Sequence, residues 1–133
     1  PFMHINGNLI NNHAILGRVG VPALRQAHIR DGVAVTRFLA WLDEKAANGS
    51  TDELEASDYL EACRRRSSEL RDLSFDTISG AGPNGAIVHY RSNESTNRKL
   101  EKGSLYLVDS GGQYPDGTTD SLDTRQRSHT PTF

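Results

Sequence analysis

The sequence predicts an α+β domain in which two helices are followed by an antiparallel β-sheet. Two observations support this fold class. Apolar residues recur at three- and four-residue steps up to about residue 70, whereas beyond residue 73 short runs of β-forming residues alternate with glycine-rich turns. The chain has 133 residues, a length that suits one domain or part of one.

The first predicted helix covers residues 22–47. Pro22 stands at its first helical position, where the missing N–H costs nothing. Asn48-Gly49 is a pair that tolerates the left-handed conformation and therefore ends the helix. The apolar stripe consists of Leu24, Ala27, Val35, Phe38, Leu39 and Leu42.

A second helix is predicted from Ser50 to about Leu70. The Ser50 hydroxyl and Glu53, three residues on, form a capping-box pattern. The run of three arginines at 64–66 lies in the last turns, where it complements the helix dipole. We favour that interpretation over phosphate binding. Cys63 has apolar neighbours and is expected to be a buried small hydrophobe rather than a nucleophile.

The second half of the chain reads as short strands at residues 74–78, 86–90 and 105–108, and residues 118–120 could open a fourth. We expect residues 1–20 to be a loop or a loosely held arm. The polar residues 121–133 lack periodicity and are expected to form a tail. The predicted domain therefore covers residues 21–120.

Composition excludes several classes of protein. The formal net charge is −2, so no basic excess points to nucleic acid. No apolar run approaches the length of a membrane span, and the first residues lack the pattern of a secretory signal. A single cysteine excludes an internal disulfide framework and a cysteine-rich zinc site. We expect a cytoplasmic protein.

The turn at residues 80–85 matches G-x-G-x-x-G, the dinucleotide-binding fingerprint. That fingerprint needs a following helix, but the next residues are strand-like. Pro83 also removes a backbone donor from the phosphate cradle. We therefore interpret the segment as a glycine-rich turn between strands.

Asp109 and Asp120 are the strongest candidates for chemistry. Asp109 follows an apolar strand, and a glycine-rich turn separates it from Asp120. In a hairpin centred on that turn the two residues can lie directly opposite, with β-carbons about 4.5–5.5 Å apart. Two carboxylates held so close repel, unless one keeps a proton or a divalent cation lies between them. The alternative is an ordinary acidic turn in water.

His89 ends the predicted strand 86–90 and is a second candidate. A histidine near a metal pair could steady an oxyanion or pass a proton. The alternative is a strand-end histidine bonded to backbone. The remaining histidines have no partner at a ligand spacing and are expected at the surface: His4, His13, His28 and His129.

Two long strings resemble the central signature of aminopeptidase P, the Xaa-Pro aminopeptidase of the creatinase, prolidase and methionine aminopeptidase superfamily. They are SFDTISGAGPNGAIVHY at residues 74–90 and LYLVDSGGQYPDGTTD at residues 105–120. Residues 28–42 also resemble the opening helix of its catalytic domain. The resemblance implies the N-terminal half of a pita-bread fold.

The resemblance further implies a two-metal centre, usually manganese, and removal of an N-terminal residue from a peptide with proline in second position. Asp120 would bridge both ions, Asp109 would hold one, and His89 would face the substrate. A homodimer is expected by analogy, with neither nucleic acid nor membrane as partner.

The family completes its metal site with one histidine and two glutamates after the second aspartate, and these do not follow Asp120 here. We therefore expect the chain to be catalytically incompetent alone. One alternative is a protein-binding domain of the same fold without catalysis. Another is an unrelated helix-plus-hairpin domain.

Overall fold

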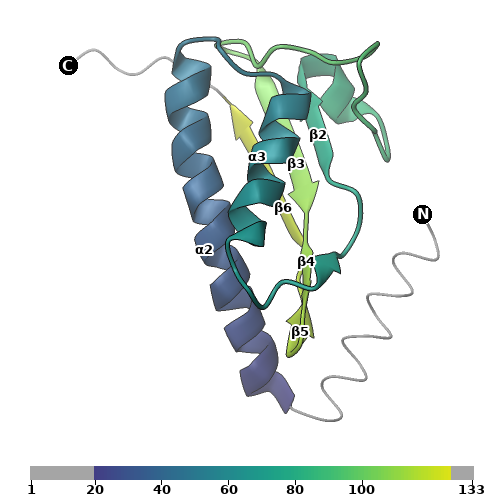
Figure 1. Ribbon diagram of the computed structural model, residues 1–133. Helices are drawn as coiled ribbons and strands as arrows, with labels where there is room; N and C mark the ends of the chain where they lie inside the picture. The colour runs from purple at the N-terminus through teal and green to yellow at the C-terminus, as the bar shows by residue number, and fades with distance from the viewer. Residues whose placement is uncertain (1–19, 127–133) are drawn as a thin grey trace.

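The computed structural model describes residues 20–126, and its elements follow the predicted order of helices and then strands (Figure 1). The two helices and the strands of an α+β domain are confirmed. In chain order the elements are α2 (Gly20–Ala47), α3 (Glu53–Arg65), β1 (Asp72–Leu73), β2 (Ile78–Ala81), the short 3-10 helix η1 (Gly82–Ala86), β3 (Leu105–Ser110), β4 (Gly112–Tyr114), β5 (Gly117–Thr118) and β6 (Ser121–Gln126).

Helix α2 forms as its apolar spacing predicts. Ala27, Phe38 and Leu42 of the predicted stripe are buried. The helix ends where Asn48-Gly49 was expected to end it, with Gly49 at φ 61°. The Gly49 amide donates to the Ala46 carbonyl, and the next amide reaches back to Lys45. Neither helix of the described region is long and apolar enough to cross a membrane.

Helix α3 differs from the prediction at both ends. Asp52, not Ser50, is its N-cap, because the Asp52 carboxylate accepts the Glu55 amide at 3.0 Å. The Ser50 hydroxyl instead donates to the Lys45 carbonyl of α2. The helix stops at Arg65 rather than near Leu70.

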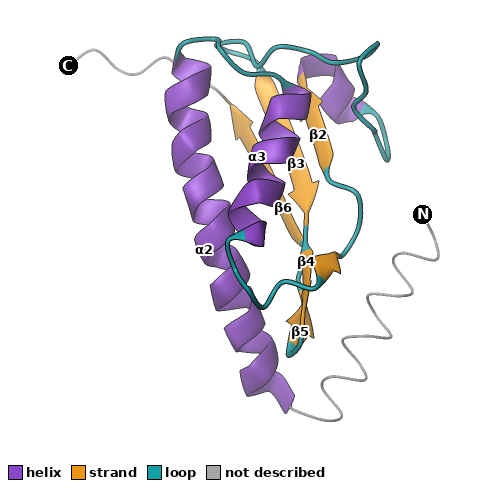
Figure 2. Cartoon of the chain, in the orientation of Figure 1, coloured by secondary structure: helices purple, strands orange, loops and turns teal. Residues whose placement is uncertain are grey.

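The strands form two three-stranded antiparallel sheets, ordered β1-β4-β5 and β2-β3-β6. One register runs through both, because Ser110 pairs with Ser121 and Gln113 pairs with Thr118. The chain from Leu105 to Gln126 is therefore one long hairpin that reverses at Pro115-Asp116 (Figure 2).

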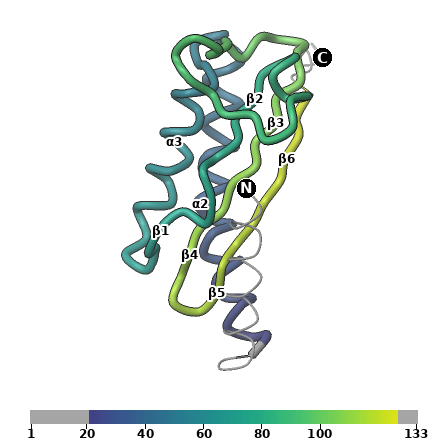
Figure 3. Tube along the Cα trace, turned by 90° about the vertical axis from the view of Figure 1, so that its right-hand side faces the viewer, coloured from purple at the N-terminus to yellow at the C-terminus, as the bar shows by residue number. Residues whose placement is uncertain are grey.

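Both helices lie on one side of the β2-β3-β6 sheet (Figure 3). Along β3, burial alternates, so that Tyr106, Val108 and Ser110 are buried. Tyr106 and Val108 pack in the core with helix residues such as Phe38, Leu42 and Leu60. On the opposite face, Leu105 and Leu122 are more than half exposed, at 54% and 65%.

Three predictions in the second half of the chain are wrong. Residues 74–77 form no strand, and β2 begins at Ile78. Residues 86–90 are not a strand but the end of η1 and the turn after it, where Val88 is 83% exposed. Residues 121–126 are not a tail but strand β6, because a polar strand can pair along a sheet edge without a buried face. The rest of that tail and residues 1–19 lie outside the described residues.

The glycine-rich turn owes its composition to close packing. A β-carbon on Gly80 would come within 2.8 Å of the Gly85 α-carbon, so η1 can fold back onto β2 only with glycine there. Residues 80 and 81 end β2, and residues 82–86 form η1, which begins the long connection from β2 to β3. The interpretation as a glycine-rich turn after a strand therefore holds, but the strand expected directly after it, at residues 86–90, does not form.

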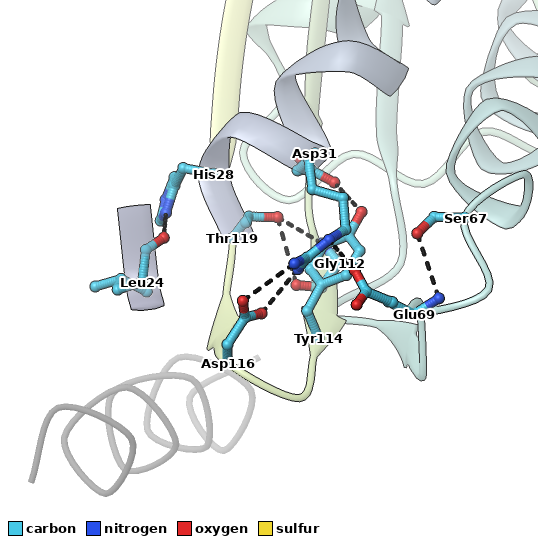
Figure 4. Close-up of polar contacts among 10 residues, drawn as sticks. Leu24, His28, Asp31, Ser67, Glu69, Gly112, Tyr114, Asp116 and Thr119 are labelled. Atoms are coloured by element: carbon cyan, nitrogen blue, oxygen red, sulfur yellow. Dashed lines mark hydrogen bonds and ion pairs between the residues drawn. The ribbon is translucent and has the colours of Figure 1, made fainter. Parts of the chain in front are cut away.

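A buried ion pair joins the two helices to the hairpin. Arg64 of α3 donates to Asp31 of α2 at 2.7 and 3.0 Å, and both side chains are almost fully buried. The Tyr114 hydroxyl of β4 donates to the same carboxylate at 2.8 Å (Figure 4). Burial by itself would raise the pKa of Asp31, but the hydrogen bonds and charge of Arg64 lower it. Arg64 thus does more than complement the helix dipole, because it is buried in an ion pair, and Cys63 is buried as expected.

Removal of Asp31 should destabilise the fold strongly. The Asp31→Ala change leaves the Arg64 charge buried without its partner, which costs about 3–5 kcal/mol. The matched control is Asp43→Ala, which breaks an exposed pair with Arg125 at 3.3 Å and should cost less than about 1 kcal/mol. Urea unfolding of the two variants measures both losses, and equal losses would contradict this account.

Candidate metal centre

Asp109 projects from the face of β3 that the helices leave free. It alternates with the buried Val108 and Ser110 and is itself half-buried. In the sheet it is flanked by Ile78 of β2 and Leu122 of β6. A carboxylate is therefore held between strands, with apolar side chains on either side.

The sequence led us to expect Asp120 directly opposite Asp109, and this prediction is wrong. Leu122 is the register partner of Asp109, and Asp120 precedes Leu122 by two residues. Because side chains two positions apart share a face, Asp120 takes the diagonal position on the same side. The residue opposite Asp109 is thus two positions further along the chain than predicted, yet the two carboxyl groups still interact.

The two aspartates are in electrostatic conflict. Burial, the charge of Asp120 and a hydrogen bond with the Asp120 carboxyl together raise the pKa of Asp109 to about 6. One Asp109 oxygen, Oδ1, is buried without a hydrogen-bond partner. Either a shared proton or a cation would relieve this arrangement.

The position of Asp120 is set by its neighbour Thr119, a residue that sequence reasoning missed. The Thr119 amide donates to the Gly112 carbonyl and its hydroxyl accepts the Gly112 amide, both at 2.9 Å. The Thr119 carbonyl accepts the Ser74 hydroxyl at 3.0 Å. A β-carbon on Gly111 would lie 1.9 Å from that carbonyl oxygen. In the sequence, the pair Gly111-Gly112 directly after the apolar strand was the feature from which this close approach could have been predicted.

His89 is in a different environment from the one predicted. It is exposed, lies in the turn after η1 and has φ 55°, the only positive φ of a non-glycine residue within 20–126. No hydrogen bond or ion pair in that same range joins it to either aspartate. His28 is exposed, as expected, and bonds the Leu24 carbonyl (Figure 4). His4, His13 and His129 lie outside the described residues.

The two carboxylates of this site suit a hard divalent cation. Carboxylate oxygens are the ligands that Mg²⁺ and Mn²⁺ prefer, and the buried Oδ1 of Asp109 has no hydrogen-bond partner that a cation would have to replace. The described part of the chain contains no group of three or more His, Cys, Asp or Glu that could hold a metal. The site therefore fits two ligands of a metal centre.

Comparison with known proteins places the chain in a family. The model of metallopeptidase family M24 matches residues 22–126. A probable Xaa-Pro aminopeptidase P of Laccaria bicolor is 48% identical over 108 residues, which are 80% of this chain and 17% of that protein. The Xaa-Pro aminopeptidase ApepP of Drosophila melanogaster is 44% identical over 108 residues, 80% of this chain and 18% of that protein.

A solved structure shows the same similarity. The X-prolyl aminopeptidase of Caenorhabditis elegans, described as a cytosolic enzyme with a di-nuclear active site, superimposes with a TM-score of 0.75 at 37% identity. The match covers 84% of this chain and 18% of that one. The resemblance to aminopeptidase P is thereby confirmed, although the chain spans less than a fifth of the length of these relatives. The chain belongs to metallopeptidase family M24.

Proposed function

We propose that this chain forms part of an Xaa-Pro aminopeptidase, a dinuclear metal-dependent hydrolase that removes the residue preceding proline at a peptide's N-terminus. The observation that carries the proposal is the pair of aspartates on one sheet face, with the buried oxygen of Asp109 unpartnered. It is supported by relatives named Xaa-Pro aminopeptidases at 44% and 48% identity.

In this proposal Asp109 and Asp120 would hold the metal: Asp120 would contribute to both ions and Asp109 to one. The ions would be manganese. When bound, the metal pair supplies Lewis-acid polarisation and a water nucleophile. His89 would face the substrate and donate a hydrogen bond to the oxyanion that forms on the scissile carbonyl.

Two aspartates are not a complete centre. Since residues 20–126 contain no larger ligand group, further ligands have to come from outside that range, and the 133 residues alone should not hydrolyse peptides. The same shortage favours the second candidate, a non-catalytic protein-binding domain of this fold. The two differ in whether the aspartates bind metal.

Three further features belong to the proposal. The substrate is a peptide with proline in second position, the location is the cytoplasm, and the enzyme is a homodimer. The location is supported by the C. elegans protein, which is described as a cytosolic enzyme.

Calorimetric titration with Mn²⁺ tests the metal site. The parent chain should bind Mn²⁺ weakly, and Asp109→Asn and Asp120→Asn should each weaken binding about tenfold or more, because each removes a ligand. Asp123→Asn is the matched control: it changes a carboxylate of β6 that bonds Arg125 instead, and it should leave binding unchanged. A parent chain that binds no Mn²⁺ favours the non-catalytic candidate.

A segment exchange tests the activity. Residues 22–126 would replace the segment that they match in the Drosophila relative. We expect the exchanged enzyme with Mn²⁺ to hydrolyse an Xaa-Pro peptide, and Asp109→Asn within it to lower kcat about a hundredfold or more.

The 133-residue chain alone is the parallel control and should show no turnover. A folded, metal-binding exchanged enzyme that fails to cleave the peptide would contradict the proposed function.

A further inference from the structure

Glu53, the first residue of α3, is a fully buried carboxylate that no family motif above assigns. Four donors meet its two oxygens. Oε1 accepts the Ala81 amide at 2.7 Å and the Asn84 side-chain amide at 2.9 Å. Oε2 accepts the Tyr90 hydroxyl at 2.6 Å and the Arg98 amide at 3.3 Å. A buried carboxylate is tolerated where hydrogen bonds satisfy it, as here.

Three of these four donors come from the segment that carries His89. Ala81 ends β2, Asn84 lies in η1 and Tyr90 directly follows His89. One carboxylate thus holds the segment at its start, its middle and its end. Local bonds tighten the same turn, since the Ile87 amide donates to the Asn84 carbonyl and the Tyr90 amide to the Ile87 carbonyl, both at 3.2 Å.

His89 itself is held in a conformation that it would not adopt freely. Its φ of 55° lies in the left-handed region, which is unfavourable for a residue with a β-carbon. Its predecessor Val88 is 83% exposed, so burial of this turn does not hold it in place. Such strain persists only where surrounding contacts determine it, and it is concentrated at functional sites. Tyr90, the residue after His89, is fixed by its amide on the Ile87 carbonyl and by its hydroxyl, which donates to Glu53 and also contacts Thr96.

We propose that Glu53 is a positioning residue: through Tyr90, Asn84 and Ala81 it holds the turn that presents His89 in its left-handed conformation. The proposal rests on the proposed function, which places His89 against the substrate. Glu53 is buried beneath the turn and acts only through it.

The chemistry of the anchor requires a carboxylate. All four partners donate, and an ionised carboxylate only accepts. Glutamine would have the same shape but would turn an NH2 group toward donors. Burial and the hydrogen bond to Glu53 raise the pKa of Tyr90, so its hydroxyl keeps the proton that it donates.

NMR of the 133-residue chain tests this directly. A residue with positive φ has a short distance between its amide and α protons and hence a strong NOE between them. We expect that NOE at His89 in the parent, its loss in Glu53→Gln and its weakening in Tyr90→Phe, which removes one donor but keeps the ring. Tyr114→Phe is the matched control, because it removes a buried hydroxyl that bonds Asp31, and it should leave His89 unchanged.

If the Glu53→Gln variant does not fold, the NOE at His89 in the Tyr90→Phe variant tests the proposal. A folded Tyr90→Phe or Glu53→Gln variant in which His89 keeps the parent NOE would overturn the proposal, as would an equal loss in Tyr114→Phe. These readings require neither metal nor turnover. Failure here is therefore distinct from failure of the peptidase assay.

Discussion

The register of the long hairpin from Leu105 to Gln126 is the constraint on which the rest of the structure depends. Because side chains alternate along a strand, one register places Tyr106 and Val108 against the helices and turns Asp109 to the opposite face. A slip of one residue would bury Asp109 in the apolar core and expose those packing residues. The same register brings Asp120 to the face of Asp109, so that the core and the candidate metal site are specified together.

Two buried carboxylates hold the sheets to the helices, and they do so by different means. Asp31 is neutralised by Arg64 and reaches β4 through Tyr114. Glu53 has no cation among its hydrogen-bond partners here and is satisfied by four neutral groups. The first fixes the turn end of the hairpin, close to Thr119 and Asp120. The second fixes the glycine-rich segment and His89. Each helix thus supports one part of the candidate site.

Local signals predicted the elements that depend on local contacts. The spacing of Ala27, Phe38 and Leu42 identified α2, and Asn48-Gly49 identified its end. Long-range contacts account for the errors. Ser50 and Glu53 had the pattern of a capping box, but the Glu53 carboxylate accepts hydrogen bonds from donors up to 45 residues away. Asp52 therefore caps the helix instead. The residues before His89 look like a strand by composition and instead form an anchored turn. The aspartate pair was found from its spacing, whereas its diagonal placement required the paired strands.

On the free face of the sheet, the half-buried Asp109 and the exposed Asp120 are in electrostatic conflict. Carbon-detected NMR titration of the Asp109 carboxyl measures this most directly, in the chain without metal. The account predicts a midpoint near 6, which falls in Asp120→Asn because the neighbouring charge is removed, while burial still holds it above the ordinary value. A midpoint near the ordinary value of about 4, unaffected by Asp120→Asn, would contradict it.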